Sequence, residues 1–193
     1  MTGRREQVLD AAIRVLGTQG TRQLTHRAVD AEAGVPSGTA SNHFRTRDAL
    51  LAGVLERLRE LETRSWERVA AELSGAVEID VFADVVGGLA LELAGPARVV
   101  TLARHALLAE AAFHDGLREE VAVQQGRIES WAAEWLRALG SPRPERDLWT
   151  VMSLLDGLLA HQCVNPDPDF DPASAIRALL HGLRETWGAP HSQ

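Results

Sequence analysis

Cysteine, lysine and long hydrophobic runs are what this sequence has least of. It contains one cysteine, Cys163, no lysine, and no uninterrupted apolar stretch approaching 18 residues. A single cysteine excludes an internal disulfide and is typical of a reducing compartment. Because no basic start is followed by a long apolar run, we expect a soluble, cytoplasmic protein that does not enter a membrane. All 20 basic side chains are arginine, which we attribute mainly to coding bias and from which we infer no function.

The sequence also lacks the short motifs of common enzyme classes. No glycine-rich phosphate loop follows a strand pattern, no nucleophile elbow is present, and no motif surrounds Cys163. His161 and Cys163 stand two positions apart, which places them on different faces of a helix and argues against a shared metal ion. We therefore expect a protein that is not an enzyme, with no catalytic residue, no metal site and no cofactor.

Charge is divided unevenly along the 193 residues. Residues 1–47 hold seven arginines and four acidic residues, a net charge of +3, whereas the remainder holds thirteen arginines and twenty-three acidic residues, a net charge of −10. An acidic chain does not coat nucleic acid unspecifically. A local basic site is still possible, because charges more than about 8 Å away are largely screened at physiological salt. The division indicates two functions in one chain.

Two short helices joined at a glycine are predicted by the stretch LTHRAVDAEAGVPSGTASNHF, which begins at Leu24. Thr25 is a favourable N-cap, and Leu24 can pack on Val29 as a hydrophobic staple. Gly34 stands where the first helix needs a residue with positive φ to close its last turn. Pro36 fits the opening of the second helix, since its missing N–H would have no partner there.

The second helix carries Ala40 and Phe44 on one side and small hydrogen-bonding side chains on the other. The outward residues are Ser37, Thr39, Ser41, Asn42 and His43. Such a pair of helices is what a helix-turn-helix needs to enter the major groove of DNA. The bare pattern also occurs in other all-helical proteins, but slim uncharged side chains with arginines on their flanks favour DNA. An earlier apolar pattern at helical spacing, ended by Gly20, completes a three-helix head.

The rest of the chain is predicted to be helical, which makes the protein all-α with about nine helices and no strand. A long helix capped by Thr46 is expected to run to a break at Ser74-Gly75. Gly87-Gly88 inside a later helix has two interpretations, namely the close approach of a ligand or a bend, and close packing of two helices.

The last two helices differ in their apolar faces. Hydrophobic residues between 148 and 163 cover more than one face, and those of the final helix form a clean stripe. We predict that they join a second copy in a four-helix dimer interface; the alternative is a helix central to its own domain. The predicted interface residues are Leu148, Met152, Leu155, Leu159, Ile176, Leu179, Leu180 and Leu183.

A small-molecule pocket in the part of the chain that follows the three-helix head is expected to use aromatic and basic residues. An inward arginine or histidine would bind an anionic ligand, while tryptophan at helical spacing is also common in a plain core. The candidates are Phe82, Arg104, His105, Phe113, Trp131, Trp135 and Trp149.

In order and spacing, roughly the first 55 residues resemble the head of the TetR-type repressors. The matching positions are Thr25, Ala28, Ala33-Gly34-Val35, Ser37-Gly38-Thr39, His43-Phe44 and Asp48-Ala49-Leu50-Leu51. The resemblance implies a homodimer, a DNA-binding domain over residues 1–47 that binds a palindromic operator, and a ligand-binding and dimerisation domain over residues 48–193. An unidentified small-molecule effector would shift the heads and release the DNA. Ser41 departs from this family, which usually has a tyrosine there that braces a phosphate, so that contact is lost, shortened or replaced by Arg45 or Arg47.

The expected DNA contacts are of two kinds. Thr25, Arg27, Arg45 and Arg47 should hold phosphates, whereas Thr39, Ser41, Asn42 and His43 should face bases, beside Ser37 and Gly38. An asparagine such as Asn42 can bind adenine in a bidentate manner, and the methyl of Thr39 can touch a thymine methyl. The sequence thus predicts a ligand-responsive repressor. The alternatives are a protein–protein adaptor with a degenerate head and an activator on the same fold.

Overall fold

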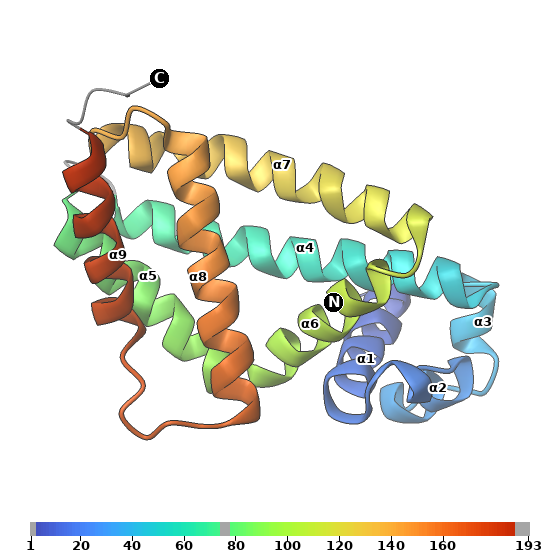
Figure 1. Cartoon of the computed structure of the whole chain (residues 1–193). Helices are drawn as coiled ribbons and strands as arrows, with labels where there is room; N and C mark the ends of the chain where they lie inside the picture. Colours follow the sequence, from blue (N-terminus) through green and yellow to red (C-terminus); the bar gives the residue numbers. More distant parts are fainter. Residues whose placement is uncertain (1–2, 74–77, 188–193) are drawn as a thin grey trace. The chain divides into compact units, whose positions relative to one another are not determined.

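The computed structural model describes residues 3–73 and 78–187, with the backbone alone for residues 123–131. Within these residues the chain is entirely helical, with nine α-helices and one 3₁₀ turn and no strand, so the predicted all-α fold is confirmed (Figure 1). The elements are α1 (Arg4–Gln19), η1 (Thr21–Gln23), α2 (His26–Ala33), α3 (Thr39–His43), α4 (Arg47–Glu72), α5 (Ile79–Ala94), α6 (Arg98–Ala111), α7 (Asp115–Ala138), α8 (Pro144–Val164) and α9 (Pro172–Trp187). The predicted helix break at Ser74-Gly75 lies outside the described residues.

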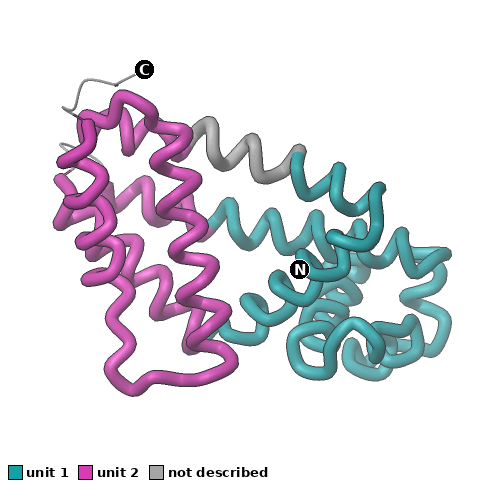
Figure 2. Tube along the Cα trace, in the orientation of Figure 1, with its two compact units in different colours: residues 1–64, 96–124 teal, residues 65–95, 125–193 magenta. Residues whose placement is uncertain are grey.

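Packing divides the chain into two compact units (Figure 2). Unit 1 comprises residues 1–64 and 96–124, and unit 2 comprises residues 65–95 and 125–193. The helix-turn-helix therefore belongs to a unit that also contains α6, which packs on α1. The boundary expected after residue 47 separates two functions and does not coincide with the boundary of either packing unit. It stays a prediction.

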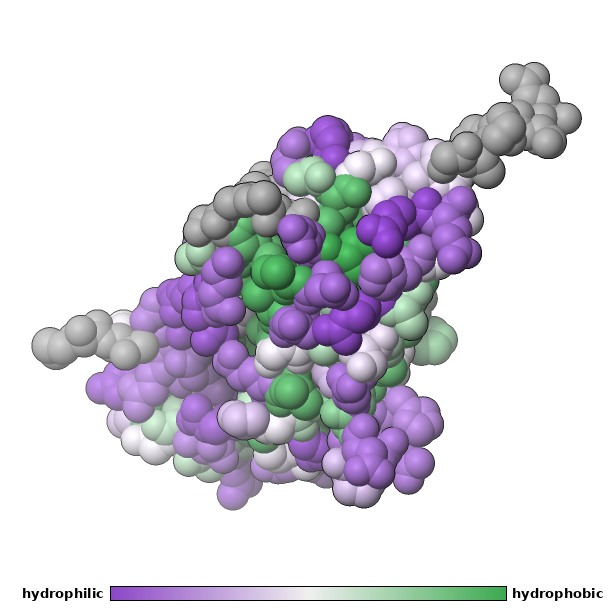
Figure 3. All heavy atoms as spheres, turned by 90° about the vertical axis from the view of Figure 1, so that its left-hand side faces the viewer, coloured by the Kyte–Doolittle hydropathy of each residue, from purple (hydrophilic) through white to green (hydrophobic). Residues whose placement is uncertain are grey.

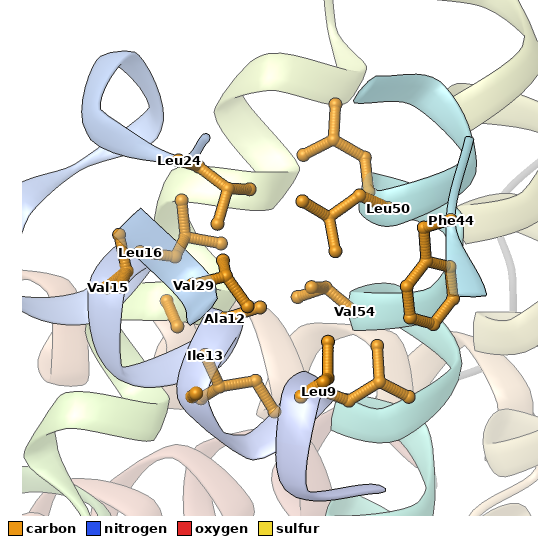
Figure 4. Packing of buried hydrophobic residues seen from close by; sticks show 14 of the residues in the cluster. Leu9, Ala12, Ile13, Val15, Leu16, Leu24, Val29, Phe44, Leu50 and Val54 are labelled. Atoms are coloured by element: carbon orange, nitrogen blue, oxygen red, sulfur yellow. The ribbon is translucent and has the colours of Figure 1, made fainter. Parts of the chain in front are cut away.

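Unit 1 is built on hydrophobic side chains that α1, α2 and α4 direct toward one another (Figure 4). Leu9, Val29 and Val54 each come from one of these helices and are 1% exposed or less. The contact between α1 and α6 is close, since a Cβ atom on Gly17 would lie 2.1 Å from the carbonyl oxygen of Val99. A glycine is therefore required where these two helices meet.

A buried arginine ties α4 to α1. Arg57 is 7% exposed, and its guanidinium donates to Asp10 and to Glu60, each over 2.7 Å. The hydrogen bond to Asp10 holds the pKa of Arg57 above its ordinary value. Because a buried guanidinium is costly without acceptors, this pairing fixes the register of α4 beneath the head.

The core of unit 2 contains an aromatic cluster to which α4, α5 and α7 each contribute one ring. The rings of Trp66 and Phe82 each lie 6.1 Å from the ring of Trp135, centroid to centroid. A Cβ on Gly87 would come within 2.6 Å of the Cβ of Ala173, so this glycine permits close packing of α5 and α9. Of the two interpretations of Gly87-Gly88, the structure supports helix packing at Gly87.

Five of the predicted dimer residues are core residues of unit 2 itself. Leu148, Leu155, Leu159, Ile176 and Leu180 are each 3% exposed or less. Their prediction as contact residues is therefore wrong, because helices that are apolar on more than one face bury the inner face within their own subunit.

The outer members of the predicted interface have a different environment. Met152, Leu179 and Leu183 are only partly buried, and they lie against the edge of the unit 2 core.

Among the described residues, no single helix has both the length and the hydrophobicity needed to cross a membrane. Helices α5 and α6 are long and hydrophobic enough only when they are taken together across the break between them.

Candidate nucleic-acid interface

Helix α2 is formed and ended by the residues that the sequence indicated. The side chain of Thr25 caps the helix by accepting a hydrogen bond from the backbone nitrogen of Ala28 over 3.2 Å. Leu24 and Val29 are both buried, as the staple requires. Gly34 closes the helix with a φ of 63°, a left-handed conformation that other residues adopt only with strain.

Helix α3 begins three residues later than predicted. It starts at Thr39, after Gly38 with a φ of 93°, whereas Pro36 lies in the preceding turn. The carbonyl of Pro36 accepts hydrogen bonds from both the backbone nitrogen and the hydroxyl of Thr39, over 3.1 and 2.6 Å. Proline here shapes the turn instead of opening the helix, because the left-handed Gly38 interrupts the helical conformation between them.

Two polar residues of α2 hold the two ends of α3. The carboxylate of Asp30 accepts from the backbone nitrogens of Gly38 and Ala40, each over 2.7 Å. At the other end, Nε2 of His26 lies 2.6 Å from the carbonyl oxygen of Phe44 and donates to it. Neither residue is among those that the sequence predicts to act at this site. The available indication in the sequence was Asp30 itself, an acidic residue beside the apolar positions Val29 and Ala33 of a short helix.

The residues expected to face bases lie on the surface of unit 1. Ser37, Ser41, Asn42 and His43 are exposed, and Thr39 is half-buried. The hydroxyl of Ser41 donates to the carbonyl of Gly38, as that of Thr39 does to Pro36. Asn42 makes no side-chain hydrogen bond to another described residue, so its amide is available to a ligand. The structure thus groups these side chains on one exposed surface.

The arginines of this region fall into two groups. Arg27 and Arg45 are exposed and have no ion pair among the described residues. Arg22 shares these properties, although it was not among the predicted contacts. Arg5 and Arg14 are paired with Glu56 and Glu32 over 2.8 and 2.6 Å.

Arg47, which the sequence predicts to hold a phosphate, also makes contacts within unit 1. Its guanidinium donates to the carbonyls of Leu24 and Thr21 over 2.8 and 3.0 Å, and it lies 3.6 Å from Glu110. These contacts bind the start of α4 to the turn before α2 and to the end of α6. Arg47 therefore has a structural role in unit 1, and its contact with a phosphate stays a prediction, since its side chain is 42% exposed.

The unit 2 residues proposed for a ligand pocket differ in their environment. Phe82 is 1% exposed within the core, and Trp135 packs against it. Trp149 is 51% exposed, with the guanidinium of Arg146 over its ring at 5.0 Å. The exposure of Trp149 does not fit the lining of an enclosed pocket. The side chain of Trp131 lies outside the described part of the structure.

The other three pocket candidates lie in unit 1. Phe113 is 85% exposed, which also does not fit an enclosed pocket. Arg104 is paired with Glu62 over 3.7 Å, and His105 is half-buried. Arg104 and His105 stay predictions.

Two hollows lie wholly among the described residues, and their linings include none of these candidates. One, of about 680 Å³, lies in unit 2 between the second half of α8 and the loop to α9, and is lined by Leu158, His161 and Phe170 among others. The second, of about 270 Å³, lies in unit 1 beside the starts of α4 and α7, where Asp48 and His114 line it. No group of three or more histidine, cysteine or acidic side chains suited to a metal ion occurs in the described residues.

Two family models match the chain. The one described as "Bacterial regulatory proteins, tetR family" matches residues 8–54, and the one described as "Tetracyclin repressor-like, C-terminal domain" matches residues 77–186. The chain belongs to the TetR family. Its helix-turn-helix and the greater part of its body both carry the family's pattern, so the resemblance extends well beyond the head. A comparison with curated protein sequences finds no match.

Solved structures of TetR type cover nearly the whole chain. The multidrug binding protein EbrR in complex with imidazole is 28% identical with a TM-score of 0.67, over 98% of this chain and 92% of that one. A TetR-family member from Streptomyces coelicolor A3 is 26% identical with a TM-score of 0.71, over 94% and 98%. A transcriptional regulator from Rhodococcus sp. Rha1 has a TM-score of 0.77 over 97% and 99%, and at 20% identity this likeness concerns the fold alone.

Proposed function

We propose that this TetR-family chain is a transcriptional repressor that binds a palindromic DNA operator as a homodimer and is released by a small-molecule effector in the cytoplasm. The observation that carries the proposal is the exposed surface formed by Ser37, Asn42 and His43 with arginines on its flanks. These side chains are slim and offer donors and acceptors, which suits direct contact with base edges.

Phosphate contacts in this proposal come from residues whose donors are not used inside the protein. Arg22, Arg27 and Arg45 belong to η1, α2 and the loop before α4, and each is exposed. Thr25 accepts a hydrogen bond at its cap and keeps its own hydroxyl hydrogen for a phosphate oxygen. Arg45 takes over the phosphate contact that Ser41 is too short to make, because Arg45 is exposed and has no ion pair among the described residues, whereas two donors of Arg47 are already used within unit 1.

Dimerisation is proposed through the outer faces of α8 and α9. Met152, Leu179 and Leu183 are left partly uncovered by unit 2, and the view of the side on which α9 lies shows hydrophobic surface among polar groups (Figure 3). A second copy on these faces would present two heads to two half-sites, which is how helix-turn-helix proteins read palindromic sequences.

An effector is proposed from the relatives. EbrR, at 28 and 27% identity, is described as a multidrug binding protein and has been solved in complex with imidazole and with ethidium. Native mass spectrometry of the purified full chain is the direct measurement. A bound molecule whose addition weakens DNA binding supports the proposal, and DNA binding that no tested molecule changes contradicts the effector role.

The test of DNA binding is selection from a random duplex pool by the purified full chain, followed by anisotropy titration of the enriched duplex. We expect an inverted repeat bound by two chains, at least about 10³-fold more tightly than random DNA. Analytical ultracentrifugation gives the stoichiometry. Failure to enrich any sequence at low salt would contradict the proposal and favour a protein–protein adaptor.

A further inference from the structure

Helix α3 is too short to set its own orientation. It has five residues, whereas isolated helices shorter than about 12–15 residues are only marginally stable in water. Its N-cap, Gly38, has no side chain to satisfy the first backbone N–H groups of the helix. The direction in which α3 presents Asn42 and His43 must therefore be fixed by contacts with another element.

Helix α2 supplies these contacts through one pair of residues. His26 and Asp30 are four positions apart and so lie on the same face of α2. Asp30 binds the backbone nitrogens of Gly38 and Ala40 at the start of α3, and His26 binds the carbonyl of Phe44 at its end. The two ends of the short helix are thus attached to two points of a longer one.

The contact at Asp30 is the stronger constraint of the two. Its side chain belongs to a residue only 3% exposed, and both carboxylate oxygens are used, one for each backbone nitrogen. A carboxylate held away from water depends on such donors, and charge-assisted hydrogen bonds are stronger than neutral ones. Two bonds from one rigid group determine both the position and the direction of the first turn of α3.

From this geometry we infer that Asp30 is a positioning residue for base recognition, which orients α3 without itself touching DNA. The inference rests on the proposed DNA-binding function. Two consequences follow. Because the N–H groups of Gly38, Thr39 and Ala40 are already bound, they are not available to a phosphate, and we expect phosphate contacts from side chains. Losing Asp30 should impair discrimination among sequences more than binding to DNA in general.

The first experiment needs no DNA. Amide hydrogen exchange is measured by NMR on the full chain and on the Asp30→Ala and Asp30→Asn variants, with thermal unfolding as a check of folding. We expect exchange at Gly38 and Ala40 to accelerate about tenfold or more in Asp30→Ala and by less in Asp30→Asn, which keeps one acceptor. Exchange at Val54 in the core should stay unchanged. Unaltered exchange at Gly38 and Ala40 would overturn the inference.

The second experiment measures the ratio of affinities for the selected operator and for random DNA. We expect this ratio to fall about tenfold or more in Asp30→Ala, with binding to random DNA changed little. Glu32→Ala is the matched control. It removes the same charge from the same helix, but Glu32 is paired with Arg14 and has no hydrogen bond to the described residues of α3, so the ratio should be kept.

The outcomes separate the inference from the proposed function. If the wild-type chain selects no DNA sequence, the proposed function fails, and the exchange experiment still decides whether Asp30 holds α3. If exchange accelerates in Asp30→Ala but the affinity ratio equals that of Glu32→Ala, the positioning role is overturned while DNA binding stands. A loss of operator and random binding by the same factor would also overturn it.

Discussion

The Cβ atom of Ala173 in α9 lies where a side chain on Gly87 in α5 would have to go. An ideal Cβ built on Gly87 would be 2.6 Å from that atom and 2.8 Å from the Cα of Ala173. The next residue, Gly88, has nothing within 4 Å of the corresponding position. Two adjacent glycines of one helix therefore have different reasons to be present, and only the first is required by packing.

Gly87→Ala and Gly88→Ala form a matched pair for chemical denaturation. The first should lower the free energy of unfolding by about 1–3 kcal/mol, because backbone and not only side-chain atoms of α9 would have to move. The second should raise it by about 0.5–1 kcal/mol, because alanine is favoured over glycine inside a helix. Equal effects of the two changes would contradict the proposed crossing of α5 and α9.

Arg45→Ala and Arg47→Ala should separate a phosphate contact from a structural one. Loss of Arg45 should reduce the slope of log K against log salt by about one for each bound head, equally for all sequences. Loss of Arg47 should leave the slope unchanged. It should instead destabilise the protein by about 1 kcal/mol, since two hydrogen bonds to the carbonyls of Leu24 and Thr21 disappear.

Anisotropy titrations between 50 and 200 mM salt measure the salt slope of DNA binding for Arg45→Ala and Arg47→Ala. Thermal unfolding of the same two variants measures their stability. A reduced slope in Arg47→Ala would restore it as a phosphate contact.

Asn42→Ala should relax recognition at one operator position. The exposed amide of Asn42 is free to bind adenine through two hydrogen bonds, so its loss should cost about 1–3 kcal/mol on the wild-type operator. Titration against duplexes altered at each position in turn identifies the base pair, at which the variant should no longer discriminate. Ser41→Ala is a control with a smaller expected effect, because that hydroxyl already donates to Gly38. Unchanged affinity in Asn42→Ala would remove the assignment.

Asp171 gives α9 a pH-dependent cap. Its carboxylate accepts from the hydroxyl and the backbone nitrogen of Ser174, and these bonds hold its pKa below the ordinary value. Since the pKa is lowered in the folded state, the stabilisation is present above the unfolded pKa and is lost as the pH falls through the folded one. Asp171→Ala should therefore be less stable than wild type at pH 7.

The difference in free energy of unfolding between wild type and Asp171→Ala should shrink as the pH falls below about 3.9, the ordinary pKa of aspartate. The neighbouring Asp169→Ala is the control, because no described residue donates to the Asp169 side chain. A difference for Asp171→Ala that is independent of pH would contradict its role as a cap.

Local rules were enough to predict most of the helical framework. Thr25, Gly20 and Gly34 begin or end helices as their side chains or positive φ angles require, and those predictions are confirmed. The start of α3 was predicted too early because Pro36 is compatible with either a turn or a first helical residue. The choice depends on Gly38, whose left-handed conformation is visible only in the folded chain.

The recognition surface was predictable to a similar extent. The exposure of Asn42 and His43 agrees with their predicted outward side of a helix, and Ser37 is exposed as predicted but lies in the turn before α3. The roles of Arg47 and Asp30 were not predictable, because their hydrogen-bond partners lie 8 to 26 residues away and are backbone groups. Backbone acceptors and donors have no residue-type signature, so a sequence pattern cannot indicate them.

What the sequence determined by itself was which segments are helical and which of their residues face outward in the head, since spacing and capping act over a single turn. Tertiary structure alone decided which apolar face of α8 and α9 is the core of unit 2, and which arginines are already bound. Both depend on contacts between segments far apart in the chain, where several faces or partners satisfy the same local pattern and only packing selects one.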